Sequence, residues 1–192
     1  MVWKLSSPKT NNSYLEAKVT LRLNHLPEKK EIAVLDAFAG KGTIWNLVQK
    51  RTDKKIRTLA VDKNYYDNID IVCDNLKVLA GIDLGRFDIV DLDAYGIPFA
   101  QMQLLFKKKY QGIVFVTFIQ SFYGNLPTGI LIQSGFTPEM IRKARTLFTK
   151  KPLEVLETYL LANNIDHYLI KSIDRKHYLC FDTTKIKGVN NE

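Results

Sequence analysis

Short apolar runs alternate with amphipathic stretches along most of the chain. Several of these runs are continuous series rich in Val, Ile, Leu and Phe, which is typical of parallel strands buried on both faces. We expect such strands at Glu31–Ala37, Ile56–Asp62, Ile69–Cys73, Phe87–Asp93 and Gly112–Ile119. Strands that alternate with helical stretches predict an α/β domain around a mostly parallel sheet, with helices on both faces.

The amphipathic stretches between the strands predict helices, notably at Gly42–Arg51, Pro98–Tyr110 and Pro138–Leu161. The last of these should be interrupted near Lys151-Pro152, because proline disfavours a continuous helix. These helices would form the connections that parallel strands require.

The C-terminal part of the chain is expected to close the sheet differently. His167–Asp174 and Lys176–Thr183 are two strand-like runs, joined by a polar turn at Asp174, Arg175 and Lys176. A turn this short predicts an antiparallel hairpin at the sheet edge. The five parallel strands and this hairpin together give an expected seven-stranded sheet.

The length of 192 residues fits one domain and suffices to bury a core without disulfide or metal cross-links. Hydrophobic residues make up 46% and charged residues 25%, which excludes a disordered or collagen-like chain. The chain contains no internal repeat and no Gly/Ser linker. We therefore predict a single domain over residues 1–192, with an N-terminal segment at 1–30 and the core at 31–192.

Neither a membrane span nor a signal peptide is predicted. No apolar run reaches the roughly 18 residues needed to cross a bilayer, and the first residues lack a signal-peptide apolar stretch. A cytoplasmic location is expected. Cys73 and Cys180 both lie inside apolar, strand-like runs, which favours reduced core thiols over a disulfide or a zinc site.

The charge balance favours a polyanionic partner. The chain has 28 Lys and Arg against 20 Asp and Glu, a net charge of +8, which would attract nucleic acid. The basic clusters are short, and each one also fits a solvated helix end. They are Lys29-Lys30, Lys54-Lys55, Lys107 to Lys109 and Lys150-Lys151.

The turn after the first strand carries the sharpest local signal, Gly40-Lys41-Gly42, at the start of a predicted helix. Glycines there let the backbone approach a ligand and direct helix-start amides at it. A dinucleotide fingerprint needs a third glycine three residues further on, where this chain has Trp45. A P-loop is excluded as well, because Gly40 is not followed by its spaced Gly-Lys-Ser/Thr run.

The segment Asp36-Ala37-Phe38-Ala39-Gly40-Lys41-Gly42 resembles motif I of class I S-adenosylmethionine-dependent methyltransferases, in the D-x-F-x-G-x-G form common among nucleic-acid methyltransferases. The order of strands and terminal hairpin is also similar to the seven-stranded, Rossmann-like fold of that family. The resemblance implies that the loop holds the amino-acid part of S-adenosylmethionine. The cofactor-binding residues that it implies here are Asp36, Phe38, Ala39, Gly40, Lys41 and Gly42.

Two later strand ends add to the implied cofactor site. Asp62 ends the second strand about 20 residues after Gly42, where Rossmann-like proteins place an acid that accepts hydrogen bonds from ribose hydroxyls. Lys63 follows it. At the end of the third strand, the family commonly uses an acidic or amide side chain to bind adenine, which implies Asp74 and Asn75. Asp74 fits equally well as the cap of the next helix.

The fourth strand ends in Asp91-Leu92-Asp93-Ala94-Tyr95-Gly96, which resembles the D-L-D-P-Y/F-G motif of tRNA guanine N2-dimethyltransferases, with Ala94 in place of proline. The resemblance implies that Asp93 accepts a hydrogen bond or proton from the nucleophilic nitrogen, and that Asp91 supports it. Tyr95 could stack on a nucleobase. Loop contacts for the two carboxylates and core packing for Tyr95 remain the alternatives.

The sequence thus predicts methyl transfer from S-adenosylmethionine to a nucleic-acid base, in RNA (including tRNA) or DNA, without a metal. The main alternative is an inactive methyltransferase-like module that binds RNA or serves as a subunit. A small-molecule or protein methyltransferase, or a glycosyltransferase with Asp91-Leu92-Asp93 as a metal-binding D-x-D, is a weaker alternative. The aromatic stretch Thr117–Pro127 and the segment Ser7–Tyr14 are candidate walls of the site.

Overall fold

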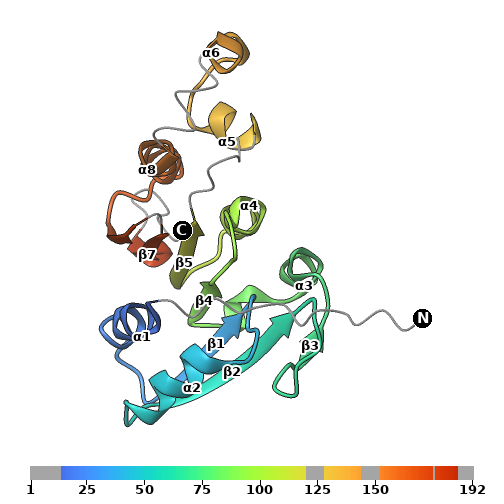
Figure 1. Cartoon of the computed structure of the whole chain (residues 1–192), viewed down its shortest axis with the longest axis vertical. Coiled ribbons are helices and arrows are strands. Elements are labelled where there is room, and N and C mark those ends of the chain that lie inside the picture. Colours follow the sequence, from blue (N-terminus) through green and yellow to red (C-terminus); the bar gives the residue numbers. More distant parts are fainter. Residues whose placement is uncertain (1–13, 120–127, 144–151, 175, 186–192) are drawn as a thin grey trace, which may run out of the picture.

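The computed structural model of the chain describes residues 14–119, 128–143, 152–174 and 176–185. These residues form a seven-stranded sheet with the order β3-β2-β1-β4-β5-β7-β6 (Figure 1). The strands are β1 (Glu31–Asp36), β2 (Lys55–Asp62), β3 (Ile71–Val72), β4 (Ile89–Leu92), β5 (Ile113–Ile119), β6 (Tyr168–Ile173) and β7 (Lys176–Asp182). Strands β1 to β5 pair in parallel, whereas β7 is antiparallel to both β5 and β6. The predicted α/β fold, with a terminal hairpin, is confirmed.

The strand order reverses direction between β1 and β4. From β1 the chain runs outward through β2 to β3 and then returns to β4 on the other side of β1. In open α/β sheets a ligand crevice forms at such a switch point, outside the carboxyl ends of the strands. A ligand site is therefore expected between the segments that follow β1 and β4.

The third strand is shorter than the range Ile69–Cys73 that the sequence predicts. The Ile69 amide donates to the Tyr66 carbonyl in a turn. The Asp70 carboxylate, rather than a backbone carbonyl, accepts from the Ala60 amide at 2.7 Å. These turn contacts leave a strand of two residues, Ile71–Val72, and place Cys73 after it in a half-buried position. The prediction of two buried thiols is thus wrong for Cys73, whereas Cys180 is buried, and neither of these two described cysteines forms a disulfide.

The described helices follow the predicted alternation with two differences. They are α1 (Leu15–Leu23), α2 (Thr43–Lys50), α3 (Asn75–Gly81), α4 (Phe99–Lys107), α5 (Thr128–Gln133), α6 (Pro138–Lys143) and α8 (Pro152–Ala162), with short 3₁₀ turns η1 (Leu84–Arg86) and η2 (Thr183–Lys185). The sequence does not predict α1 or α5. The range Pro138–Leu161, expected to be helical with an interruption near Lys151-Pro152, contains α6 and α8, and residues 144–151 lie outside the described residues. Helix α8 begins at Pro152, and proline suits a first helical position.

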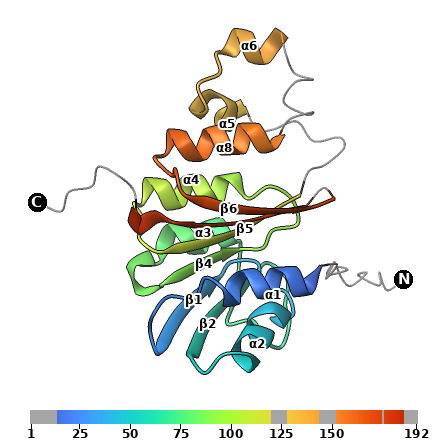
Figure 2. The same cartoon turned by 90° about the vertical axis from the view of Figure 1, so that its left-hand side faces the viewer.

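Helices cover both faces of the sheet. Helices α1 and α2 lie on one face, and α3 and α4 lie on the other (Figure 1). Successive residues of β1 point to opposite faces, so that Val34 belongs to the same core cluster as Trp45 of α2, whereas Leu35 belongs to the core cluster that contains Leu105 of α4. Helix α8 joins α4 on the second face, as Figure 2 also shows. Because both faces are covered, the strands can be apolar throughout.

Some of the basic clusters have structural contacts. The Lys108 ammonium donates to the carbonyls of Leu79, Ala80 and Ile82 at 2.7 to 2.9 Å, and so satisfies the C-terminal end of α3. Lys54 donates to the Pro27 carbonyl at 2.9 Å. These two lysines stabilise the fold, so part of the positive charge has a structural explanation.

Within the described parts of the chain, no helix combines the length and the apolar character that crossing a bilayer requires.

Candidate functional site

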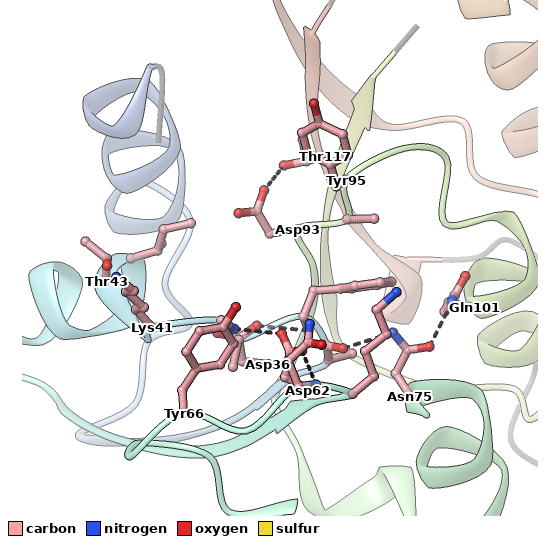
Figure 3. A pocket seen from close by; sticks show the side chains of 18 of the residues that line it. Asp36, Lys41, Thr43, Asp62, Tyr66, Asn75, Asp93, Tyr95, Gln101 and Thr117 are labelled. Atoms are coloured by element: carbon pink, nitrogen blue, oxygen red, sulfur yellow. Dashed lines mark hydrogen bonds between the residues drawn. The ribbon is translucent and has the colours of Figure 1, made fainter. Parts of the chain in front are cut away.

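A cleft of about 720 Å³ opens at the carboxyl ends of the strands, where the strand order reverses (Figure 3). Pockets for small molecules and cofactors have volumes of roughly 300 to 1,000 Å³. Residues from the ends of β1 to β5, from α1 and from β7 line it. They include Lys18, Asp36, Phe38, Ala39, Gly40, Lys41, Asp62, Lys63, Asp74, Asn75, Asp93, Tyr95, Gln101, Thr117 and Lys176. The structure thus brings almost all the predicted site residues together.

The glycine loop connects β1 to α2 through two left-handed backbone positions. Gly40 has a φ of 50° and Gly42, which precedes α2, has a φ of 67°. The Ala39 amide donates to the Val61 carbonyl at 3.1 Å, and the Asn68 side chain donates to the Gly40 carbonyl at 3.2 Å. Glycine adopts positive φ without a steric cost, so both positions suit glycine. The loop lines the cleft through Gly40 and Lys41.

Gly42→Ala is expected to lower the free energy of unfolding by about 1 to 2 kcal/mol, the cost of a left-handed conformation for a residue with a Cβ atom. An added Cβ would also lie 2.9 Å from Nδ2 of Asn68, the residue that holds the loop. Urea denaturation measures the change. The matched control is Gly81→Ala in α3, where an added Cβ meets nothing within 4 Å. Equal effects of the two substitutions would contradict the conformational role of Gly42.

Asp62 ties the glycine loop to the end of β2. One of its carboxylate oxygens accepts from the Gly40 amide at 3.0 Å, and the other accepts from the Asn64 amide at 2.8 Å. A carboxylate has about four lone-pair sites, so Asp62 can accept further hydrogen bonds from a ligand in the cleft. The side chain is therefore placed where a ribose could be bound.

Asp74 and Asn75 also line the cleft, next to Asp62 along the sheet edge. Asp74 caps α3, because its Oδ1 accepts from the amides of Leu76 at 2.9 Å and Lys77 at 3.4 Å. The Asn75 side chain donates to the Ala37 carbonyl at 3.1 Å and accepts from Gln101 at 2.8 Å. The capping role of Asp74 is thus present, and a carboxylate that caps through one oxygen retains a second for a ligand.

Asp36 is buried at the end of β1, near Asp91 of β4 and Asp93, which follows β4. The Phe38 amide donates to Oδ1 of Asp36 at 3.3 Å. Burial, together with the charges of Asp91 and Asp93, raises the pKa of Asp36 well above its usual range. The folded protein therefore binds a proton at Asp36 more tightly than the unfolded chain does.

The raised pKa of Asp36 predicts that the free energy of unfolding depends on pH. A group whose pKa rises on folding contributes stability that is present below its unfolded pKa and is lost as pH rises through the folded pKa. Asp36→Asn keeps an oxygen acceptor for the Phe38 amide and removes the charge. We expect the variant to gain stability relative to the wild type as pH increases from about 4 to 8. Urea denaturation over this range tests it, and a difference that does not vary with pH would contradict the assignment.

Asp93, Tyr95 and Thr117 gather at one end of the cleft, whereas Asp36 and Asp62 lie at the other (Figure 3). The Lys18 ammonium donates to Oδ2 of Asp93 at 2.7 Å, and the Thr117 hydroxyl donates to its Oδ1. Tyr95 is 81% exposed, so its ring does not pack in the core, and that alternative is wrong. An exposed aromatic ring next to a carboxylate suits the contact with a planar acceptor.

Asp91 lies beneath the cleft and is 1% exposed. Both of its oxygens accept from Arg22, at 2.6 and 2.7 Å, and the Trp45 indole donates to it at 2.8 Å. Burial opposes the charge of Arg22, but the paired Asp91 outweighs this effect and raises the pKa of the guanidinium. The contacts make Asp91 a structural anchor for α1 and α2. Trp45 occupies the position at which a dinucleotide-binding fold has its third glycine, and its indole makes one of these contacts.

The two acids of Asp91-Leu92-Asp93 therefore each face a different cation of α1, and not a common ion. Among the described residues, no group of His, Cys, Asp and Glu side chains is suited to hold a metal. Both carboxylates of Asp91-Leu92-Asp93 are thus paired with side chains of α1 in this structure.

Sequence reasoning missed the contribution of α1. Lys18 and Arg22 are four residues apart, on one helical face, and both are buried beside Val19 and Leu21. Their spacing places two cations on one helical face, but it does not reveal the carboxylates of Asp91 and Asp93 that they contact. Of the two candidate walls, residues 120–127 and 7–13 lie outside the described residues. Tyr14 is described, and its hydroxyl donates to Asp174.

Solved structures share this fold. A comparison with protein-family models finds no match, and a comparison with curated protein sequences finds none either. A conserved hypothetical protein of Streptococcus pyogenes is 14% identical with a TM-score of 0.52, over 86% of this chain and 94% of its own. A candidate S-adenosyl-L-methionine-dependent methyltransferase of Methanococcus maripaludis is 15% identical, with a TM-score of 0.50, over 97% of this chain and 100% of its own.

A ribosomal protein L11 methylase of Lactobacillus delbrueckii subsp. bulgaricus gives a similar result. It is 16% identical with a TM-score of 0.50, over 90% of this chain and 80% of its own. Identities this low establish a shared α/β fold with these proteins. They do not carry a substrate from one chain to another.

Proposed function

We propose that this protein is an S-adenosylmethionine-dependent methyltransferase that N-methylates a nucleic-acid base. One observation carries the proposal: the glycine loop, Asp62 and Asp93 line a single cleft at the switch point of the sheet. The fold is shared with proteins that include a methylase, which supports the same reading. The cleft is large enough for a cofactor and has room for an acceptor at its Asp93 end.

The residues at the β1 and β2 end of the cleft fit S-adenosylmethionine. The backbone of Gly40 and its neighbours would hold the amino-acid part, with Phe38, Ala39 and Lys41 beside it. Asp62 retains lone pairs for the two ribose hydroxyls. Asp74 and Asn75 would contact the adenine. Lys63, which follows Asp62, lines the same cleft. Gly42 acts indirectly, because its positive φ gives the loop its path.

The residues at the other end of the cleft would hold the acceptor. When bound, the cofactor supplies an electrophilic methyl group whose sulfonium sulfur is a ready leaving group. The acceptor nitrogen donates its lone pair to the new N–C bond while the C–S bond breaks, and the nitrogen then loses a proton. Asp93 would orient the amine by accepting a hydrogen bond and would take up that proton. Tyr95 can stack on the base, and Asp91 fixes the helix that carries Lys18.

The acceptor class rests on charge and on the exposed ring. The net charge of +8 favours a polyanion, and Tyr95 at the rim favours a planar base. RNA, including tRNA, is the acceptor that we propose first, with DNA second, for a protein located in the cytoplasm. A protein acceptor is the alternative suggested by the name of the L11 methylase. An inactive module that binds RNA or a partner subunit is the alternative without chemistry.

Transfer of tritiated methyl groups tests this proposal. The protein is incubated with labelled S-adenosylmethionine and either RNA, DNA or a ribosomal protein fraction, and the product is digested with nuclease or protease. We expect label that nuclease releases from RNA or DNA. Label released by protease alone would overturn the acceptor class. Cofactor binding without any transfer would favour the inactive module.

A further inference from the structure

Helix α1 brings a positive charge to the acceptor end of the cleft. Lys18 lies one turn before Arg22, whose bidentate contacts with Asp91 hold this face of α1 against β4. The Lys18 ammonium thereby reaches Asp93 at 2.7 Å, with side-chain exposures of only 8% and 14% for the two residues. The ring of Tyr178 flanks the ammonium, 5.9 Å from it to the ring centroid. The lysine is thus held in place by the fold and is not a mobile surface cation.

The ion pair between Lys18 and Asp93 changes the charge that an acceptor encounters at Asp93. Lys18 occupies Oδ2 and Thr117 occupies Oδ1, yet the carboxylate has about four lone-pair sites, so it can still accept from one more donor. Its negative charge, however, is already neutralised at close range. A second cation, Lys176, lines the same cleft. An ammonium group that entered would therefore meet like charge, whereas a neutral amine would meet an available acceptor.

We propose that Lys18 is a specificity-determining residue, whose ammonium takes the position of a cationic acceptor on Asp93 and so restricts the site to neutral amines. The selection among acceptors rests on the proposed function, whereas the position of the Lys18 ammonium at Asp93 does not. The exocyclic amine of a base is neutral near neutral pH, so it carries no charge that Lys18 would repel. A lysine side chain is protonated near neutral pH and would be excluded.

The test asks whether removing the Lys18 side chain creates a site for a free ammonium ion. Lys18→Ala leaves space beside Asp93 for a short alkyl chain. We expect this variant to bind n-butylammonium at least tenfold more tightly than the wild type, by NMR titration without cofactor. The gain should be absent with 1-butanol, which has a similar size and no charge. It should also disappear in Lys18→Ala/Asp93→Asn.

The control is Arg51→Gln, which breaks an exposed ion pair between α2 and Glu16 of the same helix α1. It should not change ammonium binding. If Lys18→Ala does not fold, Lys18→Met replaces it, with methylammonium as the probe for the uncovered carboxylate. No gain in ammonium binding, or an equal gain for 1-butanol, would overturn the inference. Since no cofactor is present, this result is separate from a failure of the proposed function, which would show in the wild type as a lack of cofactor binding or of methyl transfer.

Discussion

Arg22→Met is expected to lower the free energy of unfolding by about 3 to 5 kcal/mol, the largest effect on stability that we predict. Arg22 and Asp91 have side chains that are each 1% exposed, and two hydrogen bonds join them. Removing the guanidinium leaves a buried carboxylate whose remaining described donor is the Trp45 indole. An uncompensated buried charge costs far more than the loss of a surface contact. Urea denaturation followed by circular dichroism measures the change.

Two further variants separate this cause from a general sensitivity of α1. Arg51→Met breaks the exposed pair with Glu16 and should cost less than about 1 kcal/mol, because water and ions screen that contact. Arg22→Met/Asp91→Leu removes both charges and should recover much of the lost stability. A loss below about 1 kcal/mol in Arg22→Met would contradict the anchoring role of the pair.

Asp93→Asn is expected to lower kcat/KM for methyl transfer by about 100- to 10,000-fold, the range for loss of a positioned acid–base group. The amide keeps nearly the same shape but can neither take up a proton nor balance the charge of Lys18. The affinity for S-adenosylmethionine should change little, because Asp62 and the glycine loop line the other end of the cleft (Figure 3). Initial rates with labelled cofactor measure the effect.

The matched control is Asp88→Asn, at the opposite end of β4. Asp88 accepts from the Ala33 amide at 3.0 Å and pairs with Lys29, so it acts in the fold and not in the cleft. We expect its kcat/KM to remain within a few-fold of the wild type once folding is verified. Nearly full activity in Asp93→Asn, with the control also active, would remove Asp93 from the chemistry.

The central strands β1 and β4 could be predicted from the sequence because they are largely apolar on both faces. Continuous apolar runs, such as Val34–Leu35 and Val90 with its neighbours, can be recognised as strands without knowing which strands they pair with. Helix α1 could not be predicted in the same way, since its buried face contains Lys18 and Arg22. Those cations become favourable in the interior only after β4 brings carboxylates to them, which is a long-range effect that local pattern does not reveal.

The candidate site shows the same division between local and long-range information. Gly40, Gly42 and Asp62 follow from turn conformation and spacing along one βαβ unit. In the structure Gly40 and Asp62 line the cleft, and Gly42 precedes α2. Asp91 and Asp93 are two residues apart and look equivalent in the sequence. The structure separates them by depth, because Asp91 is enclosed by Arg22 and Trp45 while Asp93 reaches the cleft.

The measurement that tests the central proposal most directly is calorimetric titration of the folded protein with S-adenosylmethionine and S-adenosylhomocysteine. The wild type should bind both, and Asp62→Ala should weaken binding by about 1 to 3 kcal/mol, as for a lost hydrogen bond to a charged group. Asp53→Ala, an exposed carboxylate before β2 at the other end of the sheet, should leave binding unchanged. Absence of binding at millimolar cofactor, in wild-type protein shown to be folded, would contradict the proposed function.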